Sequence, residues 1–281
     1  KYIKTKLTTA VNSAEKDLHP FNKFAPYYNF FTGLSFFPND CINIKLNAAS
    51  GVRIPNLAEL SSNGLHEGIF TYEIGDPALK NEQNFTGNLL LSFDKDDWKF
   101  SITPFYNYIR NYVFLSPTEE EWFGFPVFRF LQQDAIQYGL ESEAECHPFK
   151  FLHAAISYSE MVSKTHYDHY TPYIPAPKMT PSIDLECPLN GKTIIDLHLE
   201  LKHAFKQDLV APLEMETPSY DLFDVSVSTS WLANHTEYEL SLVGNNLLDE
   251  DYFDHLSRLK NFGLLNMGRN FTVNLKIKNT N

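Results

Sequence analysis

The histidines are the residues of this sequence whose chemistry is most easily placed, and there are ten of them. The densest group is His166, Asp168 and His169, in the run His-Tyr-Asp-His. Imidazole and carboxylate groups at this spacing could bind a transition metal or a metal chelate. Solvated histidines on a surface loop are the commoner alternative, so both interpretations stay open, and no resident cofactor is predicted.

Motifs for catalysis are not found in the sequence. It contains no Gly-x-Ser-x-Gly elbow, no His-Glu-x-x-His pair and no phosphate-binding glycine loop. The acidic run from Glu119 to Glu121 is most simply a solvated loop tip. We therefore expect a protein that is not an enzyme.

Length and composition narrow the class of protein. The 281 residues include 23 basic and 35 acidic side chains, giving a net charge of −12, which argues against nucleic acid as a partner. Hydrophobic residues make up 43%, too many for a disordered chain. No run of apolar residues is long enough for a membrane-spanning helix, whereas membrane-spanning strands remain compatible with the sequence.

Hydrophobic residues alternate with polar ones at period two in many segments. Between 192 and 202, Ile195, Leu197 and Leu199 face one way, and Asp196 and His198 the other. Such alternation indicates strands with one apolar and one polar face. The sequence predicts an all-β protein whose polar face also carries His198 and His203.

The connections between strands alternate strictly between short turns and long loops. About 12 strands are expected, as in an antiparallel up-and-down barrel, at 1–10, 27–37, 41–48, 84–93, 98–113, 132–145, 149–162, 182–187, 192–204, 220–231, 236–244 and 269–278. The long loops cover 49–83, 114–131, 163–181, 205–219 and 245–268. Outer-membrane barrels have short periplasmic turns and long external loops, and aromatic residues such as Phe36, Trp98 and Trp231 lie near the expected turns, as in an interfacial girdle.

Three sequence boxes lie in the long loops or at their borders. The first runs from Gly51 to Gly68 and contains Arg53, Pro55, Asn56 and Glu59. The second, residues 72–82, reads Tyr-Glu-Ile-Gly-Asp-Pro-Ala-Leu-Lys-Asn-Glu and contains Gly75, Asp76, Pro77 and Glu82. The third spans 245–271 and contains Asn246, Leu247, Asp249, Tyr252, His255, Gly268 and Arg269.

In this order and at these separations, the boxes resemble the barrel signature of TonB-dependent outer-membrane receptors. The second box is similar to the family's GNPxLKPE run, with Asp76 in place of Asn and Asn81 in place of Pro. The third is similar to NLxDxxY followed by PGR, with Met267 at the Pro position. The resemblance covers about 41–278 and implies a transmembrane barrel in the outer membrane, in contact with lipid, which imports a small-molecule or chelate ligand.

Most of these box residues have an architectural interpretation as well. Arg53, Glu59 and Glu82 could pair with one another and fix loop geometry, while Gly75-Asp76-Pro77 is a turn signal. We expect such roles for the boxes rather than ligand contacts. A metal or transport role for His255 is the weaker alternative.

The resemblance also implies parts that this chain does not contain. Receptors of the family combine a plug domain, which carries the box gripped by TonB, with a barrel of 22 strands. Residues 1–281 are therefore expected to be a single region, the C-terminal part of such a barrel, with the plug and about ten strands outside it. A closed barrel of about 12 strands is the structural alternative. A stand-alone β-rich binding or adhesion module is the functional one.

Overall fold

The computed structural model describes residues 2–6, 22–26, 28–190, 193–233 and 235–279, and almost all of their regular structure is β-strand. The strands are β1 (Tyr2–Lys6), β2 (Asn22–Pro26), β3 (Phe30–Asn39), β4 (Ile42–Arg53), β5 (Asn63–His66), β6 (Thr71–Ile74), β7 (Glu82–Lys95), β8 (Trp98–Trp122), β9 (Phe125–Phe149), β10 (Leu152–Thr165), β11 (Lys178–Asn190), β12 (Thr193–Ala204), β13 (Tyr220–Ala233), β14 (Thr236–Asn245) and β15 (Asn270–Asn279). Two short helical segments complete the list, α1 (Leu57–Ser61) and the 3-10 helix η1 (Arg258–Phe262). No helix in the described ranges has the length and hydropathy of a membrane span.

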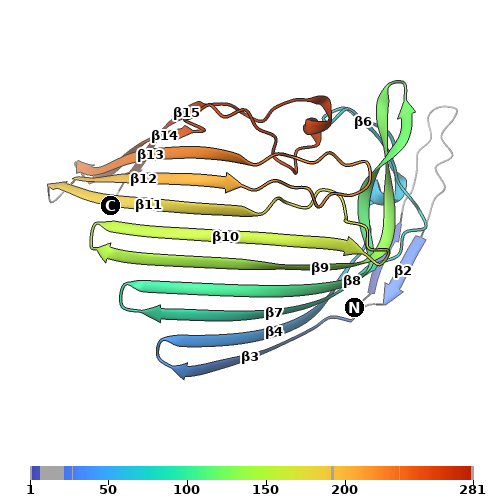
Figure 1. Cartoon of the computed structure of the whole chain (residues 1–281), viewed down its shortest axis with the longest axis horizontal. Helices are drawn as coiled ribbons and strands as arrows, with labels where there is room; N and C mark the ends of the chain where they lie inside the picture. Colours follow the sequence, from blue (N-terminus) through green and yellow to red (C-terminus); the bar gives the residue numbers. More distant parts are fainter. Residues whose placement is uncertain (1, 7–21, 27, 191–192, 234, 280–281) are drawn as a thin grey trace.

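One large antiparallel sheet forms the body of the molecule. Its strands follow the order β3-β4-β7-β8-β9-β10-β11-β12-β13-β14-β15, so each strand pairs with the next strand of the wall along the chain (Figure 1). The small hairpin β5–β6 joins this sheet through a parallel pairing of β6 with β9. The sheet is open, with β3 and β15 as its edges, and therefore forms an all-β barrel wall rather than a closed small barrel.

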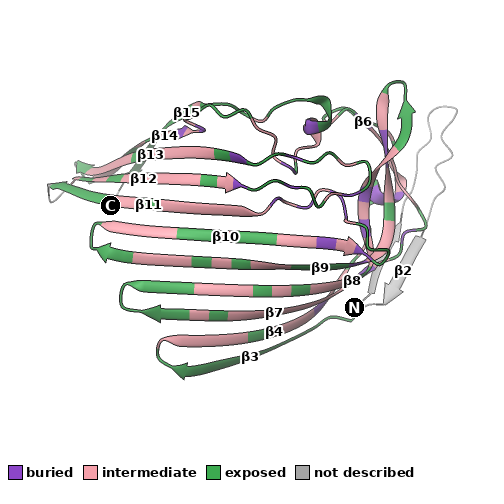
Figure 2. Cartoon of the chain, viewed as in Figure 1, coloured by how far each residue is buried: buried purple, intermediate pink, exposed green. Residues whose placement is uncertain are grey.

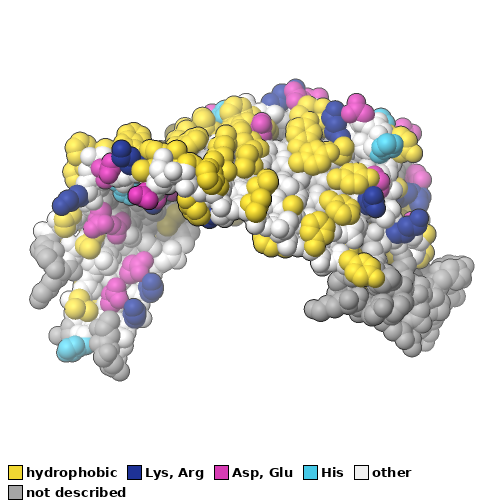
Figure 3. All heavy atoms as spheres, turned by 90° about the horizontal axis from the view of Figure 1, so that it is seen from below, with side chains coloured by type: hydrophobic (Ala, Val, Ile, Leu, Met, Phe, Trp, Pro, Cys, Tyr) yellow, Lys and Arg dark blue, Asp and Glu magenta, His cyan; other side chains and the backbone are white. Residues whose placement is uncertain are grey.

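The apolar face of this wall is continuous across the strands. Directly paired residues form the row Leu185, Leu197, Val227, Leu242 and Val273, one from each strand between β11 and β15. A second row, Ile42, Phe93, Phe100, Ala144 and Ile156, crosses β4 to β10. Figure 3 shows a broad group of hydrophobic side chains on the face turned to the viewer. An exposed apolar face of this extent suits lipid, not water.

The opposite face carries polar side chains in the same register. His153 pairs with Asp184, Asp184 with His198, and His198 with Ser226. His198 thus lies on the polar face, as expected. The prediction for His203 was wrong, because an odd-numbered residue of β12 shares the face of Leu201, and His203 pairs with Asp221 near the loop end.

All short turns lie at one end of the wall and all long loops at the other (Figure 1). Buried residues gather at the loop end, where the connections pack on one another (Figure 2). Leu60, Leu79 and Val113 form a small hydrophobic cluster there, with Phe130 packed against it. The turn end carries exposed aromatic residues instead, among them Phe36 and Trp98, in agreement with an interfacial girdle.

Two predictions about the elements were wrong. Residues 114–131 are not a loop, because β8 and β9 continue as a paired hairpin to the contact between Trp122 and Phe125. The polar run Glu119 to Glu121 lies near the tip of this hairpin, where its side chains are exposed. The expected strand 1–10 is also not part of the wall: within the described residues, β1 pairs with β2 in a separate sheet, and residues 7–10 lie outside the described part.

We predict that the two faces of β12 and β13 respond oppositely to a charge. Leu197→Lys, on the apolar row, should lower the free energy of unfolding in lipid by about 2–4 kcal/mol, because the ammonium group would face hydrocarbon. Ser226→Lys, on the polar face of the neighbouring strand, is the matched control and should cost less than about 1 kcal/mol. The measurement is urea unfolding in lipid vesicles, and equal losses would contradict the assignment of faces.

Candidate ligand-binding rim at the long-loop end

Arg53, at the end of β4, is the centre of an ion-pair cluster. Its guanidinium donates to both carboxylate oxygens of Glu82, with Nε–Oε2 at 2.5 Å and Nη2–Oε1 at 2.6 Å. Nη1 donates to Glu59, with 2.7 Å to Oε1 and 3.0 Å to Oε2. Glu82 Oε1 also accepts the backbone N–H of Val113. The three predicted partners therefore meet, and they tie β4, α1, β7 and β8 together.

Helix α1 forms in this loop because a reciprocal pair of hydrogen bonds caps its N-terminus. The Asn56 side chain accepts the backbone N–H of Glu59 at 2.9 Å, and the Glu59 carboxylate accepts the backbone N–H of Asn56 at 2.8 Å. This capping box satisfies two backbone donors that a helix start leaves free. Pro55, immediately before it, is almost completely buried. The same Glu59 thus caps the helix and neutralises Arg53.

Gly75 and Asp76 fold the chain back onto α1. A Cβ at Gly75 would lie 2.7 Å from the backbone nitrogens of Ser61 and Ser62, so only glycine fits this close approach. Asp76 donates its backbone N–H to Glu59 O at 2.8 Å, and its side chain accepts the N–H of Ala78 at 2.7 Å. Pro77 lies inside this turn, as the sequence predicts.

The third box shapes the loop between β14 and β15. Asn246 has a φ of 49° and is buried, and its side-chain amide exchanges two hydrogen bonds of 2.9 Å with the backbone of Glu250. Leu247 donates its backbone N–H to Phe223 O at 2.8 Å. Asp249 accepts the N–H of Arg269 at 2.9 Å. These contacts fix both ends of the loop.

Gly268 and Tyr252 fit the same loop closely. A Cβ at Gly268 would lie 3.2 Å from Asp249 Oδ1. The Tyr252 ring lies 4.5 Å from the Tyr220 ring, centroid to centroid. The loop is therefore packed back onto the start of β13.

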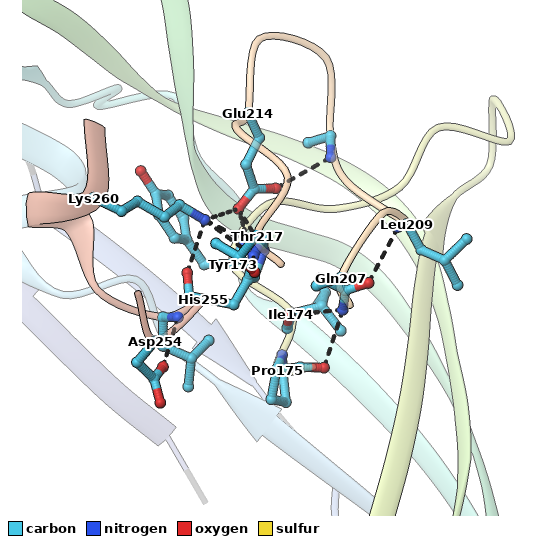
Figure 4. A network of polar contacts seen from close by, with 12 residues as sticks. Tyr173, Ile174, Pro175, Gln207, Leu209, Glu214, Thr217, Asp254, His255 and Lys260 are labelled. Atoms are coloured by element: carbon cyan, nitrogen blue, oxygen red, sulfur yellow. Dashed lines mark hydrogen bonds and ion pairs between the residues drawn. The ribbon is translucent and has the colours of Figure 1, made fainter. Parts of the chain in front are cut away.

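A buried charged network joins this loop to two others (Figure 4). The carboxylate of Glu214 lies 3.1 Å from His255 Nε2 and 3.3 Å from Lys260 Nζ. All three side chains are at most 2% exposed. Lys260 also donates to His255 O at 2.8 Å, and Thr217 Oγ1 lies 3.0 Å from His255 Nδ1. The ammonium, imidazole and carboxylate thus compensate one another away from water.

Two further contacts carry the network to the loop between β10 and β11. Glu214 accepts the backbone N–H of Tyr173 at 2.9 Å. Gln207 donates from its side-chain amide to Ile174 O and Pro175 O, both at 3.1 Å. Loops 166–177, 205–219 and 246–269 are thereby one unit.

Burial and polar contacts have opposite effects on the Glu214 carboxyl. Burial raises its pKa, but the hydrogen bonds from His255 and from the backbone, together with the charge of Lys260, outweigh this effect and lower the pKa below its usual value. Burial also lowers the pKa of Lys260, against the attraction of Glu214. The network therefore holds Glu214 ionised.

The loop between β14 and β15 also reaches the β5–β6 hairpin, far away in the sequence. Arg258 Nη1 lies 3.2 Å from Glu73 Oε1, and the rings of Phe70 and Phe262 meet edge to face with centroids 6.0 Å apart. The Arg258 guanidinium stacks over the Tyr173 ring at 5.5 Å. The first and last long loops are therefore tied together, and all these segments form a continuous rim.

The predicted metal group lies in the tight turn after β10. Asp168, with a φ of 61°, accepts a hydrogen bond from Lys164 Nζ at 2.8 Å, which lowers the pKa of its carboxyl. The backbone N–H of His166 donates to Asp134 O at 2.8 Å, and the backbone O of His169 accepts from Thr165. In the described part of the chain, no three His, Cys, Asp or Glu side chains are placed to hold a metal ion. Metal binding by His166, Asp168 and His169 stays a prediction.

The network around Glu214 was not found by sequence reasoning. Glu214, Gln207 and Thr217 belong to no box, and their loop shows no periodicity. The only sequence feature that pointed to this network was His255, which lies inside the third box. Its partners come from loops that meet only in the folded wall.

The match to a family model decides which kind of barrel this is. Residues 3–247 match the model described as "TonB dependent receptor-like, beta-barrel". The chain belongs to this family. Its relatives are receptors and transporters of the outer membrane of Gram-negative bacteria, and the barrel wall described above is located there.

Solved structures show the same fold at low sequence identity. The copper transporter OprC aligns with a TM-score of 0.74 at 15% identity, covering 93% of this chain and 41% of OprC. BauA, the ferric preacinetobactin receptor from Acinetobacter baumannii, gives 0.63 at 14%, covering 93% and 37%. The FrpB iron transporter from Neisseria meningitidis gives 0.60 at 16%, covering 92% and 39%. The chain thus spans about two fifths of the length of these receptors.

We predict that Glu82→Gln lowers the free energy of unfolding by about 1.5–3 kcal/mol, because it removes the charge from the hydrogen bonds between a buried carboxylate and the half-buried guanidinium of Arg53. The matched control is Glu120→Gln, which removes the exposed pair between Glu120 and Arg129. It should cost at most about 1 kcal/mol. Equal effects in denaturant titrations would show that the Arg53 cluster contributes no more than a surface pair.

The Glu214 carboxylate predicts a loss of rim order in acid. Its pKa in the folded protein lies below that of the unfolded chain, so its stabilisation is complete above about pH 4.3 and is lost as the pH falls through the folded value. Proteolysis within 205–219 should therefore accelerate in acid in the wild type. Glu214→Gln should be cleaved faster at neutral pH and lose this acid-dependent step. A Glu214→Gln profile that parallels the wild type would refute the assignment.

Proposed function

We propose that this chain forms the loop-bearing wall of an active transporter, which binds a scarce ligand at the cell surface and imports it with energy from the TonB complex. The observation that carries the proposal is the rim. Long loops from both halves of the sequence are fastened to one another by the Arg258–Glu73 ion pair and the Phe70–Phe262 ring contact. Within each half, a cluster of compensated charges fixes the loops. Rigid positioning of loops favours ligand binding, because less conformational entropy is lost on association.

The ligand class that we favour is a metal chelate. The names of similar structures refer to copper, ferric preacinetobactin and iron, at identities that by themselves establish only the fold. This chain adds suitable surfaces at the loop end: the Tyr72 and Trp122 rings lie 4.7 Å apart, and Phe123 beside them is 86% exposed. Aromatic faces of this kind can stack on a catecholate or a sugar. Cobalamin and oligosaccharides are the other two ligand classes that we propose for this surface.

The energy-coupling partner would act through a part of the receptor that lies outside this chain. The resemblance implies a plug domain in the lumen, and the polar inner face of the wall supports this because it offers hydrogen-bonding groups across its width. TonB would reach the receptor through that plug. Ligand, plug and wall would thus meet at the rim.

The proposal predicts saturable and energy-dependent uptake by the native receptor in whole cells. Radiolabelled ferric chelates, copper, cobalamin and a labelled oligosaccharide would be offered to cells grown under iron limitation. We expect one of them to accumulate in the wild type and not after the proton gradient is collapsed, because TonB-dependent transport needs that energy. No accumulation of any of them in excess of a receptor-deletion strain would contradict the proposed ligand class.

A matched pair of variants connects this uptake to the rim. Lys260→Met removes the buried ammonium group, whereas Lys276→Met removes an ammonium that is 71% exposed and paired with Glu239 on the wall. The first variant should lower the affinity for the accumulated ligand at least about tenfold, equivalent to 1.4 kcal/mol, with unchanged surface abundance. The second should leave the affinity unchanged.

A receptor that is soluble and monomeric without detergent would instead fit the stand-alone binding module.

A further inference from the structure

A cavity of about 410 Å³, lined by both polar and apolar residues, lies on the inner face, at the end of the wall opposite the rim. Its wall includes His153, Asp184, Glu186, Asp196 and His198, which come from β10, β11 and β12 near their short turns. None of these residues belongs to the family boxes or to the rim. The cavity therefore requires an explanation of its own.

Asp184 fixes the orientation of both histidines. Its Oδ2 lies 3.1 Å from His153 Nδ1, and its Oδ1 lies 2.6 Å from His198 Nδ1. An ionised carboxylate can only accept hydrogen bonds, so both imidazoles donate from Nδ1, and in the neutral form each leaves Nε2 as an acceptor. His153 Nε2 is buried, and no described group forms a hydrogen bond with it, although Glu145 Oε2 lies 3.8 Å away. His198 Nε2 likewise lies 3.9 Å from Glu200 Oε2. The two histidines are therefore surrounded by carboxylates, which adds to the negative charge of this part of the wall.

The next row of the sheet places two carboxylates directly opposite each other. Glu186 on β11 pairs in register with Asp196 on β12, and both line the cavity. Like charges at such positions destabilise a strand pair. Both side chains are exposed. Among the described residues, Asp196 has only a hydrogen bond of 3.5 Å from Ser228 Oγ, and the Glu186 carboxylate has no hydrogen bond or ion pair. Lys150 also lines the cavity but makes no ion pair with a described residue.

We propose that this cavity is a binding site for an organic cation, an ammonium or guanidinium group that inserts between Glu186 and Asp196 on the inner wall of the barrel. The groups lining the site are rich in acceptors: two opposed carboxylates, two imidazole nitrogens and the hydroxyls of Ser226 and Ser228. Such a wall complements a group with several N–H donors and a positive charge. The volume accommodates a Lys or Arg side chain or a small free amine.

Two sources could supply this cation, and both would reach it from the lumen. One is a basic side chain of the polypeptide that occupies the lumen in the complete receptor. The other is a free cation in transit along the inner wall, attracted by its carboxylates. Both involve the same chemistry, and the experiment below separates them.

The test compares thermal unfolding of the complete receptor, purified in detergent, with that of the double variant Glu186→Gln/Asp196→Asn. If a basic side chain of the receptor already occupies the site, removing both charges abolishes its partners, and the melting temperature should fall by about 2 °C or more without any added amine. If the cation is a free one, the double variant should melt earlier than the wild type only when a free amine is added. A double variant that melts no earlier than the wild type, both with and without the added amine, would overturn the proposal. The single variant Glu186→Gln repeats the test if the double variant does not assemble.

Agmatine, which carries both an ammonium and a guanidinium group, distinguishes the two sources. For a free cation, agmatine should raise the melting temperature of the wild type but not of the double variant, while the uncharged butylurea should have no effect. For a basic side chain already in place, agmatine should leave the wild type unchanged, while the double variant still melts earlier. Glu239→Gln is the control, because this carboxylate lies on β14 outside the cavity and is paired with Lys276 at 3.1 Å. A fall as large in Glu239→Gln as in the double variant would also overturn the proposal.

Discussion

Backbone hydrogen bonding is the constraint on which the rest of this structure depends. Within a bilayer no water is available to satisfy a free N–H or C=O group, so a spanning strand must pair on both sides. The wall meets this requirement by adding each strand to its predecessor, from β3 to β15. The edges β3 and β15 still need partner strands in lipid. Period-two alternation then gives one apolar face and one polar face throughout.

Because the strands of such a wall are constrained by pairing and alternation, the residues that can vary with function lie at its two ends. At the loop end, charged side chains are buried or half-buried, which is tolerable because each has a partner of opposite charge or a backbone group. Arg53 connects two carboxylates, and Glu214 connects a lysine, a histidine and two backbone donors. These clusters give long loops the rigidity that hydrophobic packing supplies in a globular core.

Sequence reasoning succeeded where the physics is local or periodic. The alternation between Ile195 and Lys202 predicted β12, and the separation of Asn56 from Glu59 is that of the capping box that forms. It failed at 114–131, where β8 and β9 continue beyond the wall as a paired hairpin whose sequence lacks regular alternation. It failed also for His203, which lies on the same face of β12 as Leu201 and not on the face of His198. Local chemistry did not reveal the pairing of Glu214 with His255, because the two lie 41 residues apart.

The all-β class, the division into turn and loop ends, and the family signature can be read from the sequence, because each depends on residue order over short distances. Which loops touch is known only from the fold. Arg258 meets Glu73 across 185 positions, and His153, Asp184 and His198 converge through the register of three strands. Register fixes which side chains are neighbours across a sheet, and it is set by pairing along the whole strand rather than by any one segment.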